Sequence, residues 1–232
     1  MQSAMSAGRR SRRSRDAVAT LLALALLLAW DATGWDLVTA RLFGGPSGFV
    51  WRDTWWASTL LHDGGRIAAW WVLAVVMVTA LRPAPAGTPS RRLRWRWVGV
   101  MLLCVLLVPA IKHFSLSSCP WELAEFGGAA SHLSHWRWGV ADGGPGHCFP
   151  SGHAVSAFAF FGLYFLWRDH DPWRARACLA VVLAAGVLFG AAQLVRGAHY
   201  PSHTLWTAWL CWTICAIAHH GFVRSDGRSK AH

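Results

Sequence analysis

The sequence predicts an all-α integral membrane protein built as a six-helix bundle. Of its 232 residues, 54% are hydrophobic and only 14% are charged, and the mean hydropathy is positive. This balance is too apolar for a soluble domain of the same length. Many of the 17 tryptophans stand near the ends of apolar runs, where membrane proteins carry their interfacial aromatic belts. Composition and aromatic placement therefore indicate a chain that lies in a bilayer.

Six apolar runs define the predicted spans. In chain order they cover residues 17–38, 66–81, 97–111, 151–167, 175–194 and 201–218. Several are shorter than the about 20 residues that a helix needs to cross a bilayer, so we expect their ends to continue into the flanking turns. A long segment, 114–147, separates the third span from the fourth, and loops of that length are usually functional.

The domain organisation follows from these spans. We expect a basic N-terminal segment at 1–16, one membrane domain at 17–223 and a short tail at 224–232. The apolar run that follows the basic segment continues past Trp30 without a small-residue cleavage site before a polar domain. The first span is therefore predicted to be an anchor that is retained.

The net charge of +11 would suggest a nucleic-acid partner in a soluble protein, but the basic residues here alternate with the spans. Sixteen of the 22 lysines and arginines fall on one side of the predicted bundle, in segments 9–15, 82–96, 168–176 and 224–230. The positive-inside rule then places both termini in the cytoplasm and the other ends of the spans outside it. We expect no nucleic-acid partner.

Two spans open with histidines beside proline and serine, at 150–153 and at 199–203. The start of a helix offers unpaired backbone N–H groups and the positive end of the helix dipole, where a phosphate can bind. An imidazole titrates near neutrality, so a neutral ring can attack while a protonated ring donates. Both motifs lie at the outer membrane face, which predicts phosphoryl transfer there with no metal ion and no cofactor.

Other groups at the same face suit the negative oxygens of a phosphate ester, which need cations and N–H donors around them. Lys112 ends the third span and Arg196 ends the fifth. Ser151 and Gly152 offer a hydroxyl and backbone N–H groups. We assign no catalysis to Asp31 or to the interfacial histidines such as His135.

The order of these residues resembles that of the type 2 phosphatidic acid phosphatase superfamily, which includes membrane lipid phosphatases and soluble vanadium haloperoxidases. The motifs of that family run Lys-x6-Arg-Pro, Pro-Ser-Gly-His and Arg-x5-His-x3-Asp. In this chain they correspond to residues 112–120, 150–153 and 193–203, and only the second is complete. The resemblance covers the outer half of the third to sixth spans and matches the six-span layout.

The resemblance assigns a role to each matching residue. It implies that His199 is the nucleophile, which forms a phosphohistidine, and that His153 is the general acid. It further implies that Lys112, Ser151 and Gly152 bind the phosphate.

Three positions depart from the family pattern, and each changes a polar group. Cys119 replaces the first arginine, Gln193 replaces the second, and His203 replaces the acid that orients the nucleophile. Arg196 or Arg137 is expected to supply the missing guanidinium. His203 can hold the nucleophile by accepting a hydrogen bond, although an imidazole stabilises a developing positive charge less than a carboxylate does. A bacterial subgroup of the family has a similar Cys-Pro and Arg-Gly-Ala-His pattern.

Cys119 and Cys148 are the two of the six cysteines that fall in outer segments. An oxidising outer compartment would allow a disulfide between them, and the alternative is two unpaired thiols. A disulfide would tie the long loop 114–147 to the start of the second motif.

These observations predict a metal-independent phosphatase that removes phosphate from a lipid phosphomonoester or pyrophosphate. We expect it in the bacterial inner membrane with its active site facing the periplasm or the cell exterior. Two alternatives stay open at this point: a lipid phosphotransferase, and a non-catalytic phospholipid-binding or transport protein on the same scaffold.

Overall fold

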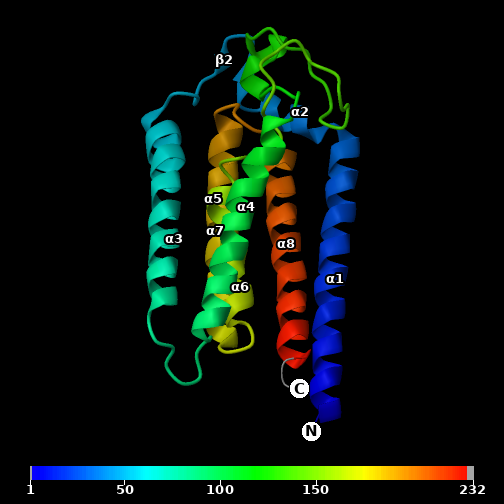
Figure 1. Ribbon diagram of the computed structural model, residues 1–232. Helices are drawn as coiled ribbons and strands as arrows, with labels where there is room; N and C mark the ends of the chain where they lie inside the picture. The colour runs from blue at the N-terminus through cyan, green and yellow to red at the C-terminus, as the bar shows by residue number, and fades with distance from the viewer. Residues whose placement is uncertain (1, 229–232) are drawn as a thin grey trace.

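The computed structural model describes the backbone of residues 2–228 and the side chains of residues 11–222. Its long helices lie side by side in one bundle, with a cap of longer connecting segments at one end and shorter loops, α3 to α4 and α6 to α7, at the other (Figure 1). Helix α1 begins and helix α8 ends at the opposite end of the bundle. The fold is therefore all-helical, as the composition predicts.

The helices follow one another with short connections except in the cap. They are α1 (Gln2–Thr33), α2 (Trp35–Arg41), α3 (Gly65–Leu81), α4 (Arg91–His113), α5 (Val155–Phe158), α6 (Phe161–Trp167), α7 (Pro172–Val195) and α8 (Pro201–Arg228). A π-helical segment, Trp56–Gly64, leads directly into α3. The cap also holds a two-stranded antiparallel hairpin of β1 (Gly44–Gly45) and β2 (Gly48–Phe49), together with 3-10 turns at Pro120–Glu122 and Ala124–Phe126.

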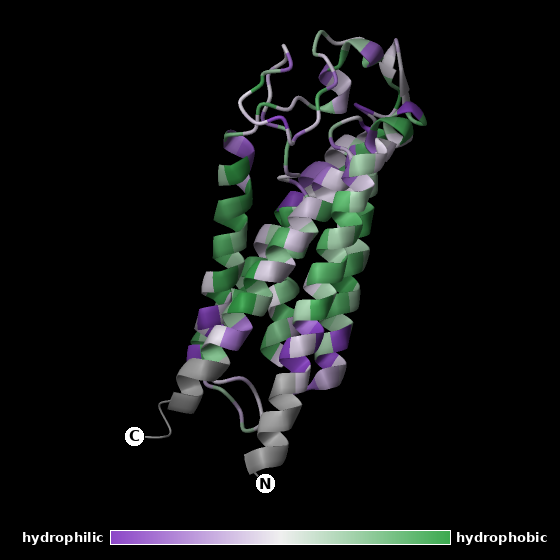
Figure 2. Ribbon diagram, turned by 90° about the vertical axis from the view of Figure 1, so that its right-hand side faces the viewer, coloured by the Kyte–Doolittle hydropathy of each residue, from purple (hydrophilic) through white to green (hydrophobic). Residues whose placement is uncertain are grey.

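Four helical segments of the described chain are long and apolar enough to cross a membrane. They are Ser11–Thr33, Trp56–Leu81, Arg91–His113 and Pro172–Val195. The apolar helix Val155–Trp167 is shorter. The middle of the bundle is correspondingly hydrophobic in Figure 2, and polar residues gather toward its two ends. This composition is that of a membrane-embedded helical bundle.

Several ends of the predicted spans differ from those in the structure. The first predicted span, 17–38, ends at Thr33 because Gly34 adopts a left-handed conformation, with φ of 70°, and the short helix α2 follows. The second begins earlier than predicted, at Trp56. Helix α8 continues to Arg228, and residues 229–232 of the predicted tail lie outside the described residues.

The fourth predicted span, 151–167, is not one continuous helix. It divides into α5 and α6, and the backbone tightens between them. The Phe160 N–H donates to the Ala157 carbonyl at 3.1 Å, three residues back, so the regular α-helical spacing is interrupted there.

Side chains at two helix starts explain where those helices begin. The Ser90 hydroxyl accepts a hydrogen bond from the Leu93 N–H at 3.2 Å and caps α4. The Asp171 carboxylate accepts from the N–H groups of Trp173 and Arg174 at 3.1 and 3.0 Å and caps α7. Proline at the first position of α7 suits a helix start, since it lacks the N–H that would need a partner.

The hydrophobic core of the described residues consists of two clusters. The larger lies within the bundle and joins α4, α5, α6 and α8; its buried members include Trp97, Met101, Phe158, Phe165 and Cys211. The smaller lies in the cap and consists of Ala40, Phe49, Leu123, Phe126, Ala130 and Tyr200. The motif at 150–153 is followed by residues of the larger cluster, and the motif at 193–203 contributes Tyr200 to the smaller one. The cap and the bundle therefore both position the motifs.

Helix α7 packs closely on α5 at Gly186, and a substitution at this position tests the packing. A Cβ atom at this position would lie 2.2 Å from the Phe158 ring, which is inside van der Waals contact. We expect Gly186→Ala to lower the free energy of unfolding in detergent by about 1–3 kcal/mol through overpacking. Gly99→Ala, in α4, meets nothing within 4 Å and should be neutral or stabilising. Equal melting temperatures for the two variants would contradict this packing.

Candidate active site

The loop between α7 and α8 sets the position of His199. Helix α7 ends at Val195, and Gly197 reverses the chain with a left-handed φ of 73°. The N–H groups of Ala198 and His199 then donate to the Gln193 carbonyl at 2.9 and 3.2 Å. A hydrogen-bonded helix end of this kind holds the histidine backbone in one place.

The imidazole of His199 is almost fully buried, with 4% of the residue exposed. Its Nδ1 lies 3.4 Å from Cys148 Sγ and 3.4 Å from His203 Nδ1. Burial, and then the positive charge of Lys112, hold the pKa of His199 well below its ordinary value of 6.5. The ring is therefore neutral at neutral pH, with Nδ1 turned toward the protein and Nε2 left for another partner.

His153 lies in the turn that leads into α5. Its ring packs against the rings of His62 and Phe189, with centroids 4.6 and 5.0 Å away. Its Nε2 atom is buried and has no hydrogen-bond partner among the described residues. Burial, and then the charge of His62, lower the pKa of His153 to about 3. A buried ring nitrogen with no partner is a position where a ligand oxygen can bind.

Lys112 approaches the second motif from the end of α4. A Cβ atom on Gly152 would lie 3.3 Å from its Cδ and 3.6 Å from its Nζ, so the ammonium group lies directly over this glycine. Lys112 is also one of the charges that lower the pKa of His199. Glycine thus gives the lysine room to reach the same space as the nucleophile candidate.

Ser151 is held more firmly than the sequence indicates. Its backbone N–H donates to the His203 carbonyl at 3.0 Å, and its hydroxyl accepts from the Ala154 N–H at 3.4 Å. Its carbonyl accepts from the Thr207 hydroxyl at 2.9 Å. The Ser151 N–H is therefore occupied, and the hydroxyl remains its donor for a ligand.

Arg196 is the arginine that the fold brings to the site. Its Nε donates to the Arg52 carbonyl at 2.9 Å, and its guanidinium lies 5.8 Å from the centre of the Trp121 ring. Its Nη1 is buried without a partner among the described residues. Its charge contributes to the lowered pKa of His153, whereas the other candidate, Arg137, is exposed in the loop 114–147.

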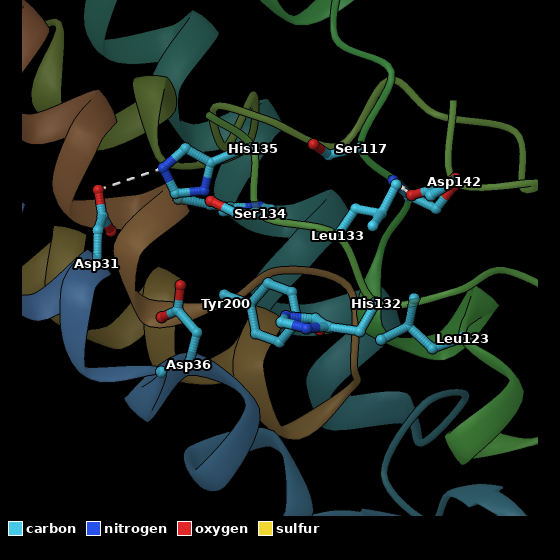
Figure 3. A pocket seen from close by; sticks show the side chains of 13 residues that line it. Asp31, Asp36, Ser117, Leu123, His132, Leu133, Ser134, His135, Asp142 and Tyr200 are labelled. Atoms are coloured by element: carbon cyan, nitrogen blue, oxygen red, sulfur yellow. Dashed lines mark hydrogen bonds and ion pairs between the residues drawn. The ribbon is translucent and has the colours of Figure 1, made fainter. Parts of the chain in front are cut away.

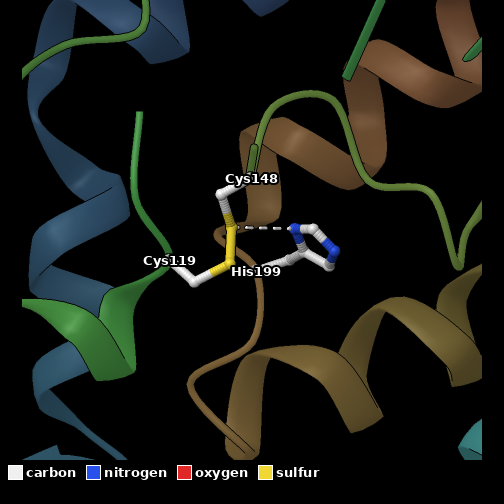
Figure 4. A group of neighbouring side chains, drawn as sticks. All are labelled: Cys119, Cys148 and His199. Carbon is white, nitrogen blue, oxygen red and sulfur yellow. Dashed lines mark hydrogen bonds between the residues drawn. A yellow bond between two sulfur atoms is a disulfide. The ribbon is translucent and has the colours of Figure 1, made fainter. Parts of the chain in front are cut away.

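Cys119 and Cys148 are joined by a disulfide, which lies directly against the His199 ring (Figure 4). The bond connects the cap to the second motif. Sulfurs and ring nitrogen lie within 4.8 Å of one another, but metal ions bind thiolates, and both sulfurs are oxidised here. In this state the trio is a packing contact for the imidazole and not a set of metal ligands.

His203 lines a small cavity of about 50 Å³, together with several acidic and imidazole side chains (Figure 3). Its ionisable lining residues are Asp31, Asp36, His132, His135, Asp142, Tyr200 and His203. The residue in the position of the family's acid thus faces a polar cavity with carboxylates from other parts of the chain.

Asp31, at the end of α1, has three hydrogen-bond partners, all at one carboxylate oxygen. Its Oδ2 accepts from the ring N–H groups of Trp136 and Trp206 at 3.0 and 2.9 Å and pairs with His135 Nε2 at 3.2 Å. The His135 ring lies perpendicular to the His203 ring, with centroids 5.7 Å apart. Asp31 therefore holds the imidazole that packs against His203.

Asp36 fixes the start of α8. It accepts from the backbone N–H of Ser202 at 3.1 Å and also from its hydroxyl. Trp30 Nε1 donates to the same carboxylate at 2.8 Å. Asp36 thus ties α2 to the helix start that follows His199.

Asp31 and His135 lie near the site although the sequence analysis assigns them no catalysis, and His62, which was not among the predicted site residues, packs against His153. Asp31 and His62 each stand in or beside an apolar run, where a polar residue is costly and usually has a reason. That signal could have singled them out, but it could not have identified their partners.

A search of curated proteins finds no match to this chain, and a search of solved structures finds none either.

A family model gives a clear result. The model of the PAP2 superfamily matches residues 94–226, which is more than half of the chain and includes all three motifs. The chain therefore belongs to the PAP2 superfamily, and this membership supports a phosphatase-type activity on phosphate esters.

Proposed function

We propose that this protein is a metal-independent phosphatase that hydrolyses a lipid phosphomonoester or pyrophosphate through a phosphohistidine at His199. The observation that supports it best is the proximity of two histidines, a lysine and an arginine: beyond the effect of burial, Lys112 and His153 both lower the pKa of His199, and Arg196 lowers that of His153. In this group, His153 Nε2 and Arg196 Nη1 are both buried without partners among the residues that the structure describes. Such donors suit the oxygens of a phosphate group.

In the first step, His199 Nε2 attacks phosphorus and a nitrogen–phosphorus bond forms as the ester oxygen leaves. His153 gives its proton to that oxygen. Lys112, Arg196 and the N–H groups around Gly152 stabilise the equatorial oxygens of phosphorus, where the negative charge lies in the transition state. The products of this step are the free alcohol, or phosphate ester in the case of a pyrophosphate, and phosphohistidine.

The lowered pKa values of His199 and His153 fit this assignment. Burial keeps His199 neutral, as a nucleophile must be. A bound phosphate brings negative charge next to His153 and raises its pKa, so the ring becomes protonated only with substrate present. Neutral His153 then accepts a proton from water in the second step, water attacks phosphorus, and the nitrogen–phosphorus bond breaks to release phosphate.

His203 replaces the carboxylate that orients the nucleophile. With His199 Nδ1 and His203 Nδ1 3.4 Å apart, the first can donate to the second. The positive charge that develops on His199 is then shared with a second imidazole, and the His135 ring that packs against His203 is itself paired with Asp31. Asp31 would thus take over, at longer range, part of the role of the missing acid.

The setting of the site favours a lipid substrate. The reactive groups lie at one end of apolar helices, at the depth of the lipid headgroups, so an acyl or prenyl tail can stay in the membrane. The basic segments lie at the other end, and the positive-inside rule places that end in the cytoplasm. We therefore propose six spans with cytoplasmic termini, in the bacterial inner membrane, with the site facing the periplasm or the cell exterior.

Replacing either histidine tests the mechanism. We expect His199→Ala to lower phosphate release from a panel of lipid phosphates by about 10³-fold or more, and His153→Ala by about 10²–10⁴-fold, because the first removes the nucleophile and the second the acid. The assay uses the purified full chain with a chelator present. His170→Ala, at the opposite end of the bundle, should retain full activity as the matched control.

The same variants separate the two roles. An aryl phosphate has a leaving group that needs no proton, so it should restore the first step in His153→Ala and let phosphohistidine accumulate, while His199→Ala forms none. Undiminished phosphate release by either variant would refute the mechanism. Transfer of phosphate to an added lipid alcohol in place of water would identify a phosphotransferase.

The disulfide gives an independent prediction. Reduction should lower the melting temperature of the protein, because the Cys119–Cys148 bond closes a loop with a sequence separation of 29 and such bonds typically stabilise by about 2–4 kcal/mol. It should also lower kcat/KM about tenfold, since His199 loses a fixed neighbour. The double variant Cys119→Ser/Cys148→Ser should resemble the reduced protein and no longer respond to reductant. An unchanged activity after reduction verified by mass spectrometry would contradict this role.

Asp31→Asn tests the long-range acid. The amide oxygen can still accept from the two tryptophan N–H groups, so the change removes charge with little change in shape. We expect kcat to fall about tenfold with KM unchanged, because the charge acts on the transition state. Glu125→Gln removes a carboxylate that pairs with Arg41 on the surface of the cap, and its effect should be within twofold. Equal effects of the two substitutions would exclude a specific role for Asp31.

A further inference from the structure

We propose that a basic pocket at the end of the bundle opposite the histidines binds the phosphate of an anionic glycerophospholipid. The pocket is a cavity of about 350 Å³ between residues 12–16 of α1, the end of α6 and the start of α7. Its charged lining residues are Arg12, Arg15, Asp16, Arg168 and Arg176. Basic pockets between membrane helices recognise lipid headgroups in this way.

The charges of the pocket are not balanced. Asp16 is its one acidic lining residue, and it already pairs with Arg168 Nη2 at 2.9 Å and with His220 Nε2 at 3.0 Å. Arg12 pairs with Asp169, outside the cavity lining. Arg15 and Arg176 form no ion pair with any residue whose side chain the structure describes. Two guanidinium groups are thus left for an anion.

Arg168 provides the second, independent observation. It is buried, with 7% of the residue exposed, and its guanidinium lies 5.0 Å from the centre of the Phe165 ring. Asp16 holds one end of the guanidinium, while Nη1 is buried and lacks a hydrogen-bond partner among the described residues. A buried charged donor without an acceptor is costly, and a phosphate oxygen in the pocket would satisfy it.

The depth of the pocket indicates a lipid as the source of that phosphate. Two candidate spans, Ser11–Thr33 and Pro172–Val195, begin beside it, so the arginines lie where a membrane surface meets the bundle. In Figure 2 the polar residues at this end give way directly to the hydrophobic middle of the helices. Phospholipid headgroups occupy this level of a bilayer.

Exposed apolar side chains continue from each free arginine along its helix. On α1, Val18 and Leu22 follow Arg15 at spacings of three and seven residues, which places them on the same helix face. On α7, Leu183 follows Arg176 at a spacing of seven. These side chains can contact the acyl chains of a lipid whose phosphate lies in the pocket, whereas a free anion would make no use of them.

The experiment uses the full chain, purified and delipidated in detergent, and measures its melting temperature as phosphatidylglycerol is added. The pocket variant is Arg15→Gln/Arg176→Gln, and the matched control is Arg91→Gln/Arg92→Gln, which removes two exposed charges at the same end of the bundle outside the pocket. Phosphatidylcholine and inorganic phosphate serve as separate probes. The single variant Arg176→Gln is included in case the double variant is unstable.

We expect phosphatidylglycerol to stabilise the wild type and the control equally, and the pocket variant to need about tenfold more lipid for half of the effect. The single variant should lie between them. Phosphatidylcholine and inorganic phosphate should have little effect. An unchanged response of the pocket variants, an equal loss in the control, or full stabilisation by inorganic phosphate alone would each overturn the proposal. None of these results depends on the enzymatic activity.

Discussion

The structure depends on the placement of one buried imidazole. His199 lies out of water, with Nδ1 against the Cys148 sulfur and His203, and its backbone is fixed by the Gln193 carbonyl. Removing an imidazole from water favours its neutral form, so the same burial that positions the ring also keeps it in the protonation state that the proposed mechanism needs. Burial therefore sets both the position of the His199 ring and its protonation state.

The cap is joined to the bundle around the His199 ring. It has a hydrophobic cluster of its own, separate from that of the bundle, and three kinds of bond join it to the helices around the site. The disulfide connects it to the second motif, the Trp121 N–H donates to the Gly197 carbonyl at 2.9 Å, and Asp36 binds Ser202 at the start of α8. The cap and the bundle can therefore shift little with respect to each other at this point.

Sequence patterns within single segments predicted the candidate site residues that stand at helix ends. His153, His199, Lys112 and Arg196 stand at helix ends, and a helix end can be read from apolar runs and flanking prolines. Asp31 could not be found in the same way, because its partners are separated from it by more than a hundred residues and only packing brings them together. The break between α5 and α6 escaped prediction for a related reason, since apolar periodicity continues across it.

The bond between Cys119 and Cys148 has a consequence for when the protein works. Its Cys148 sulfur lies 3.4 Å from His199 Nδ1, and a disulfide persists where the surroundings are oxidising. A newly made chain still in contact with the reducing interior of a cell would lack this support. With the site on the proposed outer side of the membrane, export completes the protein chemically as well as topologically, because the disulfide closes only after the loop 114–147 has crossed.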